Sequence, residues 1–203
     1  MKIAVLGAGA WGTALAMHIS QQHQVCLWAR KAAHVDGMRK VRANPLYLGD
    51  FKFNDNLTVE SDLSAALKDV DFILSVVPTS GFRAMLQSIK ALGVKAPVIW
   101  ANKGLEPVSA KLPHEVAFEE FGNERAWGAL SGPSFAAELV RGLPTAVTLA
   151  ANTSACAPRG EAPRETCRFT SGPAYGLPGC VAITSRMAAL RAASGTGISR
   201  TVS

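Results

Sequence analysis

Short apolar runs alternate with amphipathic segments along the first 151 residues of this 203-residue chain, and this alternation constrains the fold most. The runs are apolar throughout, which is typical of strands covered on both faces of a sheet. Helices that cross from each strand to the next in the right-handed sense join such strands into a parallel sheet. The pattern therefore predicts an α/β fold with a doubly wound, mostly parallel sheet. We expect its strands at residues 2–6, 25–29, 57–61, 71–77, 97–101, 126–130 and 145–151.

The stretch VLGAGAWGTALA, residues 5–16, carries three glycines in the spacing G-x-G-x-x-G directly after the first expected strand. The helix expected at residues 10–22 begins inside this motif, which is the placement that a dinucleotide-binding (Rossmann-like) fold requires. Gly7 permits the tight turn, Gly9 lets the backbone approach a pyrophosphate, and Gly12 lets the helix pack closely. The N–H groups at the helix N-terminus then face the phosphates. A glycine-rich turn without a ligand is the alternative.

Two cations follow the second expected strand, at the place where an acidic residue would bind the ribose 2′-hydroxyl of NAD. They are Arg30 and Lys31 in the stretch LWARK, which contains no acidic residue. A guanidinium and an ammonium group both pair well with a phosphate dianion. The sequence therefore favours NADPH over NADH, with a solvated basic turn as the alternative.

Two further stretches follow the carboxyl ends of expected strands, where ligands bind in open α/β sheets. WANKGLE contains Lys103, whose ammonium group can pair with a phosphate or polarise a carbonyl. LSGPSFAAE places Gly132 and Ser134 at the start of an expected helix, a second seat for an anion or a carbonyl. Each has a simpler alternative, with Lys103 as a surface cation and Ser134 as a helix cap.

In combination and in this order, the motifs resemble those of the bacterial glycerol-3-phosphate dehydrogenase [NAD(P)+] family. The resemblance covers residues 1–151 and implies reduction of dihydroxyacetone phosphate to sn-glycerol 3-phosphate, for glycerophospholipid synthesis. Ketopantoate reductases and 6-phosphogluconate dehydrogenases share the N-terminal fold, but WANKGLE together with SGPSFAAE argues against both. The motifs that carry the resemblance are GAGAWGTALA, VCLWAR, SVVP, WANKGLE, SGPSFAAEL and GLPTAVTLA.

The same resemblance assigns roles to individual residues. It implies that Lys103 touches both cofactor and substrate in a supporting catalytic role, and that Gly132 and Ser134 contact the substrate. The further cofactor contacts that it implies are Ala10, Trp11, Arg30, Tyr47 and Ala136.

The composition changes near Asn152, and nothing after it resembles the family. Residues 153–203 contain no Lys, Asp, Asn, Gln, His or Trp, and they hold three of the four cysteines, in neither zinc-site nor CxxC spacing. We expect a dinucleotide-binding domain at residues 1–151 and an irregular or disordered tail at residues 152–203, with room for one strand or helix within residues 173–193. A reading-frame change near residues 152–155 fits this shift, and a genuinely divergent tail is the alternative.

The tail also affects the dehydrogenase activity that we expect of this chain. Members of the family continue into a helical second domain that supplies a catalytic lysine in a segment resembling GGALKN, whereas this chain has no Lys after Lys111. The resulting hypothesis is weak NADPH binding with little or no dehydrogenase activity. A stand-alone NADP(H)-binding module or a non-functional fragment is the alternative.

The net charge of +6 does not indicate a nucleic-acid partner, because much of the excess lies after residue 152, where six Arg face two Glu. No apolar run approaches the roughly 18 residues that span a bilayer, and the N-terminal segment lacks a signal-peptide core. We therefore expect a cytoplasmic protein with no membrane span. The family resemblance implies a small phosphorylated substrate, and we expect no metal site. The sequence leaves the oligomeric state open.

Overall fold

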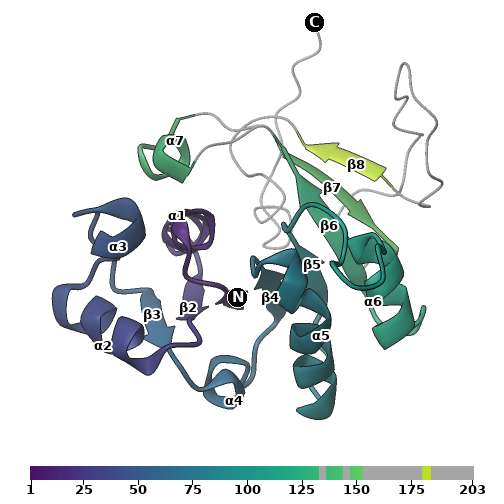
Figure 1. The fold of residues 1–203 in the computed structure, drawn as a ribbon. Helices are drawn as coiled ribbons and strands as arrows, with labels where there is room; N and C mark the ends of the chain where they lie inside the picture. Colours follow the sequence, from purple (N-terminus) through teal and green to yellow (C-terminus); the bar gives the residue numbers. More distant parts are fainter. Residues whose placement is uncertain (133–135, 144–146, 153–179, 184–203) are drawn as a thin grey trace, which may run out of the picture.

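The computed structural model describes residues 1–132, 136–143 and 147–152, and the backbone of residues 180–183. Within these residues one sheet forms the centre of the molecule, with strand order β3-β2-β1-β4-β5-β6-β7-β8 (Figure 1). The strands are β1 (Lys2–Leu6), β2 (Gln24–Trp28), β3 (Leu57–Glu60), β4 (Phe72–Ser75), β5 (Val98–Trp100), β6 (Trp127–Ser131), β7 (Val147–Ala151) and β8 (Cys180–Ile183).

The first six strands are parallel, as the sequence predicts, while β7 and β8 run antiparallel to their neighbours. The mostly parallel, doubly wound α/β fold is thus confirmed. The segment that contains β8 lies within the residues for which the sequence allowed one strand or one helix. The other expectations for the tail, and the placement of Ser134, fall outside the described residues.

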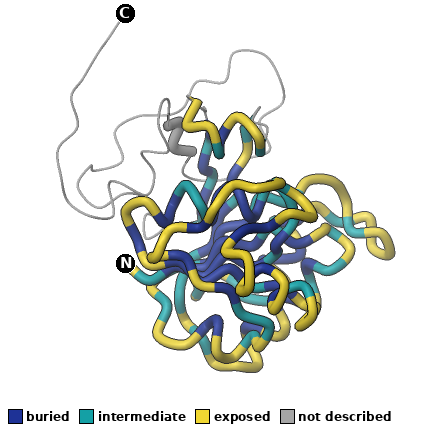
Figure 2. The backbone as a smooth tube through the Cα atoms, turned by 90° about the vertical axis from the view of Figure 1, so that its left-hand side faces the viewer, coloured by how far each residue is buried: buried dark blue, intermediate teal, exposed yellow. Residues whose placement is uncertain are grey.

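Helices cover both faces of the sheet. Leu15 of α1, Val35 of α2 and Leu139 of α7 belong to the apolar cluster on one face, whereas Leu86 of α5 and Val116 of α6 belong to the cluster on the other. Figure 2 shows the buried strands in the centre, with exposed segments of the chain on the outside. The helices are α1 (Ala10–Ile19), α2 (Ala32–Val41), α3 (Pro45–Leu48), α4 (Leu63–Ala66), α5 (Phe82–Ala91), α6 (Pro113–Phe121) and α7 (Ala136–Val140), with a 3₁₀ turn η1 (Thr79–Gly81) before α5.

Local signals explain where several helices begin. Asp62 caps α4 by accepting a hydrogen bond from the Ser64 N–H at 3.0 Å. Pro113 occupies the first turn of α6, where its missing N–H costs nothing, and the Glu115 carboxylate accepts from the Leu112 N–H at 2.7 Å. No helix among the described residues is long and apolar enough to cross a bilayer.

Asn152 fastens the end of β7 to the start of β6. Its N–H donates to the Trp127 carbonyl at 3.0 Å, and its side-chain oxygen accepts from the Trp127 N–H at 2.8 Å. Its side-chain NH₂ donates to the Arg125 carbonyl at 2.9 Å. Because β7 is antiparallel to β6, this fastening lies at the edge of the sheet where the parallel strands begin.

Candidate functional site

The strand order reverses between β1 and β4, since the chain builds outward through β2 and β3 before it returns to β4. In sheets of this kind ligands bind in the crevice beyond the carboxyl ends of the two strands at such a reversal. The register pairs Leu6 with Ser75, and the Val76 N–H donates to the Leu6 carbonyl at 2.8 Å. The glycine loop after β1 and the segment after β4 therefore leave the sheet side by side.

Two of the three glycines are required by the protein itself. Gly7 has φ +118°, and a Cβ added there would lie 2.7 Å from the Val76 carbonyl oxygen. A Cβ added to Gly12 would lie 1.9 Å from the Gly7 carbonyl oxygen, so α1 packs directly against the turn. The sequence predicts a strand through Val77, but β4 ends at Ser75, and the next residue lies against this glycine turn.

The third glycine has no such requirement. Gly9 has φ −75°, which any residue adopts, and a Cβ added to it would meet no heavy atom of the described residues within 4 Å. Gly9 is the residue before α1 and has no side chain to cap the helix, whose first turn contains Ala10, Trp11 and no acidic residue. A helix N-terminus of this kind attracts anions. The loop therefore fits a phosphate group that approaches from outside the protein.

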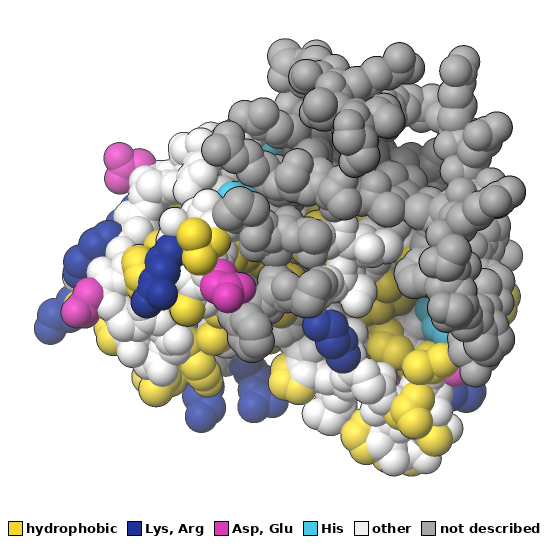
Figure 3. Space-filling model, turned by 90° about the horizontal axis from the view of Figure 1, so that it is seen from above, with side chains coloured by type: hydrophobic (Ala, Val, Ile, Leu, Met, Phe, Trp, Pro, Cys, Tyr) yellow, Lys and Arg dark blue, Asp and Glu magenta, His cyan; other side chains and the backbone are white. Residues whose placement is uncertain are grey.

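Arg30 and Lys31 lie exposed between β2 and α2, and in the described part of the chain no carboxylate pairs with either of them. Glu60, at the carboxyl end of the adjacent β3, is engaged elsewhere. It pairs with Arg39 at 3.0 Å, and its carboxylate accepts from the Ser61 N–H at 2.8 Å. Hydrogen bonds from the backbone are the main reason why the pKa of Glu60 is lowered. The face seen from above carries its described Lys and Arg side chains in separate groups (Figure 3).

Other residues implicated by the sequence lie around the same edge of the sheet. Tyr47 in α3 is half exposed, with its ring centroid 5.7 Å from that of His34. Gly132 follows β6, and Ala136 begins α7, which packs against α1. The sequence predicts no helix at residues 45–48, so the local context of Tyr47 emerges only from the structure.

Lys103 follows β5 and is exposed, and its carbonyl accepts a hydrogen bond from the Thr79 hydroxyl at 2.7 Å. The neighbouring Asn102 has both polar atoms of its side chain buried and, among the described residues, without a hydrogen-bond partner. Thr79 lies after β4, so this contact joins the two segments that leave the sheet at the carboxyl ends of β4 and β5. The backbone of Lys103 is thereby fixed while its ammonium group stays accessible.

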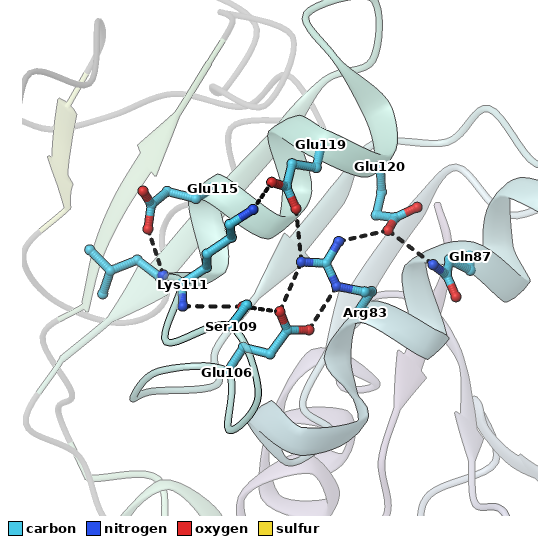
Figure 4. Close-up of polar contacts among 9 residues, drawn as sticks. Arg83, Gln87, Glu106, Ser109, Lys111, Glu115, Glu119 and Glu120 are labelled. Carbon is cyan, nitrogen blue, oxygen red and sulfur yellow. Dashed lines mark hydrogen bonds and ion pairs between the residues drawn. The ribbon is translucent and has the colours of Figure 1, made fainter.

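An ion-pair cluster that the sequence analysis missed anchors the segment after Lys103. Arg83 on α5 contacts Glu106 through Nε and Nη2, each at 2.8 Å, and reaches Glu119 at 2.8 Å and Glu120 at 2.9 Å on α6 (Figure 4). The partners lie 23, 36 and 37 residues from Arg83 in the sequence. A bidentate guanidinium–carboxylate pair of this kind fixes orientation as well as distance. The Arg83 cluster therefore holds the WANKGLE segment against α5 and α6.

The cluster shifts the ionisation of its members. The pKa of Arg83 is raised above its ordinary value by hydrogen bonds to the three carboxylates. Hydrogen bonds from Arg83 and from the Ser109 hydroxyl lower the pKa of Glu106 to about 2, from an ordinary value of 4.5. The folded state therefore favours the ionised form of Glu106 at pH values above about 2.

Glu106→Gln is expected to make thermal stability less dependent on acidic pH. Because the pKa of Glu106 is about 2 when folded and near 4.5 when unfolded, its stabilisation is fully present above pH 4.5 and is lost as the pH falls through 2. Unfolding midpoints measured between about pH 5 and pH 2 should fall less steeply in the variant. Asp50→Asn, which alters an exposed carboxylate outside the cluster, is the control and should keep the original slope. Equal slopes in all three proteins would contradict the assignment.

The comparisons with known proteins agree with this geometry. The family model described as "NAD-dependent glycerol-3-phosphate dehydrogenase N-terminus" matches residues 2–157. The glycerol-3-phosphate dehydrogenase [NAD(P)+] of Methylobacillus flagellatus is 65% identical over 159 residues, which are 78% of this chain and 48% of that protein. The enzyme of the same name from Aromatoleum aromaticum is 48% identical over 159 residues, with the same coverage.

The fold is shared with a solved member of the same group. The crystal structure of glycerol-3-phosphate dehydrogenase from Coxiella burnetii has a TM-score of 0.71 and 41% identity, covering 75% of this chain and 47% of that one. The chain spans about half the length of the curated relatives it matches. It belongs to the NAD-dependent glycerol-3-phosphate dehydrogenase family, and it carries that family's N-terminal, dinucleotide-binding part.

Proposed function

We propose that this chain binds NADPH at the carboxyl edge of its sheet. The observation that carries the proposal is Gly9, whose open side is filled by no atom of the described residues although its backbone conformation suits any residue. A pyrophosphate that approaches the backbone there explains the glycine, and the N-terminus of α1 supplies a positive dipole end.

The finer assignments follow from the same geometry and from the family. The exposed Arg30 and Lys31 favour NADPH over NADH, because their charges match a 2′-phosphate and nearby Glu60 is held by Arg39. The family resemblance adds Ala10, Trp11, Tyr47, Lys103 and Ala136 as cofactor contacts. A boundary between residues 151 and 152 and a cytoplasmic location stay predictions of the sequence.

We further propose that the reaction of the whole enzyme is the reduction of dihydroxyacetone phosphate to sn-glycerol 3-phosphate, as the names of the relatives suggest. The bound nicotinamide cofactor supplies the hydride for the carbonyl carbon. The Lys103 ammonium group then stabilises the negative charge that develops on the carbonyl oxygen. By the resemblance, Gly132 and Ser134 hold the substrate beside it.

For the 203-residue polypeptide taken alone, we expect NADPH binding without appreciable turnover. Transfer of a hydride to the substrate carbonyl forms an alkoxide, which needs a proton as well as charge stabilisation. A positioned general acid contributes about 10²–10⁴-fold to the rate of such a reaction. Residues 112–203 contain no Lys, so these 203 residues by themselves do not include the second lysine that the resemblance implies. Fluorescence titration measures NADPH binding, and cofactor oxidation with dihydroxyacetone phosphate measures turnover.

The full-length relative from Methylobacillus flagellatus is the control for this assay. Turnover by the polypeptide at a rate comparable to that relative would show that the 203 residues suffice for catalysis. Failure to bind either NADPH or NADH would overturn the cofactor proposal and favour a non-functional fragment.

A further inference from the structure

Asn44 lies in the segment between α2 and α3 and is fully buried. Its side-chain NH₂ donates two hydrogen bonds, one to the Ala8 carbonyl at 3.0 Å and one to the Thr13 hydroxyl at 2.8 Å. Ala8 is the residue between the first two glycines of the motif, and Thr13 is a fully buried residue of α1. One amide therefore binds both the glycine loop and the helix that follows it.

The bond to Ala8 determines how the loop presents its next donor. The Ala8 carbonyl and the Gly9 N–H belong to one planar, trans peptide unit, so they point in opposite directions. In the described part of the chain the Gly9 N–H donates to no protein group. When Asn44 holds the Ala8 oxygen toward the interior, it turns the Gly9 N–H away from the interior.

The remaining polar atom of Asn44 connects this loop to α2. The Asn44 side-chain oxygen lies 2.9 Å from His34 Nε2, and because an amide oxygen only accepts, the imidazole N–H is the donor. His34 is in the first turn of α2, directly after the exposed Arg30 and Lys31. All polar atoms of the Asn44 side chain are thus engaged, and their partners lie in the glycine loop, in α1 and in α2.

We propose that Asn44 is a positioning residue for dinucleotide binding, which fixes the Ala8–Gly9 peptide so that its N–H faces the pyrophosphate. This inference rests on the proposed cofactor site. A buried amide with satisfied hydrogen bonds is well suited to this, because an alternative loop conformation would leave its donors unpaired in the interior. Since NADH and NADPH share the pyrophosphate, Asn44 contributes equally to the binding of both.

Asn44→Asp tests this directly. The substitution keeps the shape but replaces the NH₂ donor by a carboxylate oxygen, so the Ala8 carbonyl loses its partner and faces a negative charge. We expect the Kd values for NADPH and NADH each to rise about tenfold or more, with their ratio unchanged. In the cofactor-free chain, hydrogen exchange at the amides of residues 7–12 should also become faster.

Two controls separate positioning from general stability and from cofactor choice. Asn152→Asp disrupts a similar set of hydrogen bonds at the opposite edge of the sheet and should leave both Kd values unchanged in the folded protein. Arg30→Ala should weaken NADPH binding alone. Where Asn44→Asp does not fold, Thr13→Val and Thr13→Ser replace it. The proposal is supported if Thr13→Val binds both cofactors more weakly while Thr13→Ser binds them as tightly as the unaltered chain.

The outcomes distinguish the inference from the proposed function. If the unaltered chain binds both cofactors and the Asn44→Asp variant binds them equally well, the positioning role is overturned and the cofactor site stands. Equal affinities in the two Thr13 variants and the unaltered chain would likewise overturn the positioning role and leave the cofactor site in place. If the unaltered chain binds neither NADPH nor NADH, the proposed function itself is overturned.

Discussion

Gly12→Ala is expected to lower the free energy of unfolding by about 3 kcal/mol, at the upper end of the usual cost of overpacking. The added methyl carbon would lie 1.9 Å from the Gly7 carbonyl oxygen, so either the glycine turn or α1 has to move. Urea denaturation followed by circular dichroism measures the effect as a lower midpoint. A slope unchanged from the unaltered protein shows that stability itself has changed.

Gly9→Ala is the matched control, since it adds the same methyl group three residues earlier. In the part of the chain that the structure describes, no heavy atom lies within 4 Å of the new carbon, so the free energy of unfolding should change by less than about 0.5 kcal/mol. NADPH binding should nevertheless weaken, because the methyl group enters the space proposed for the pyrophosphate. Equal destabilisation by the two substitutions would contradict the different roles assigned to the two glycines.

Arg30→Asp is expected to weaken NADPH binding about 100-fold while it changes NADH binding little. The substitution removes a charge-assisted contact to the 2′-phosphate and places a negative charge beside it. The same carboxylate can accept a hydrogen bond from the ribose 2′-hydroxyl of NADH. Parallel fluorescence titrations with both cofactors give the ratio of Kd values, which is the informative quantity.

Lys95→Asp makes the same change in charge on the exposed segment before β5, at the far edge of the sheet. It should leave the affinities for NADPH and NADH nearly unchanged. That result would show that a change in net charge alone does not alter cofactor binding. An Arg30→Asp variant with an unaltered ratio of Kd values would identify the stretch LWARK as a solvated basic turn.

The parts of the fold that the sequence predicts well are those specified by local patterns. The glycine turn could be placed because its spacing, the strand before it and the helix after it lie within residues 2–19. The apolar runs likewise located the strands, because a strand covered on both faces has few polar positions. Such runs contain no information about direction, so the antiparallel course of β7 could not be predicted from them.

The unpredicted parts of the site depend on contacts between distant residues. Asn44 lies 36 residues from Ala8 and 31 from Thr13, and nothing in the stretch NPLYLGD indicates that its amide reaches the glycine loop. Arg83 similarly occurs in an ordinary amphipathic helix, and only the packing of α5 on α6 brings the glutamates to it. Helix α3 has four residues, too few for a periodic pattern to indicate a helix.

The hydrogen bonds of Asn152 have a consequence for how a chain of this kind can be joined to other sequences. All three bonds are made to Arg125 and Trp127, so the backbone N–H and both polar side-chain atoms of Asn152 are bonded to residues that precede it. A different segment can therefore be attached after Asn152 without removing the partner of any of these three groups. Residue 152 is for this reason a favourable crossover point for recombining the domain with another catalytic half.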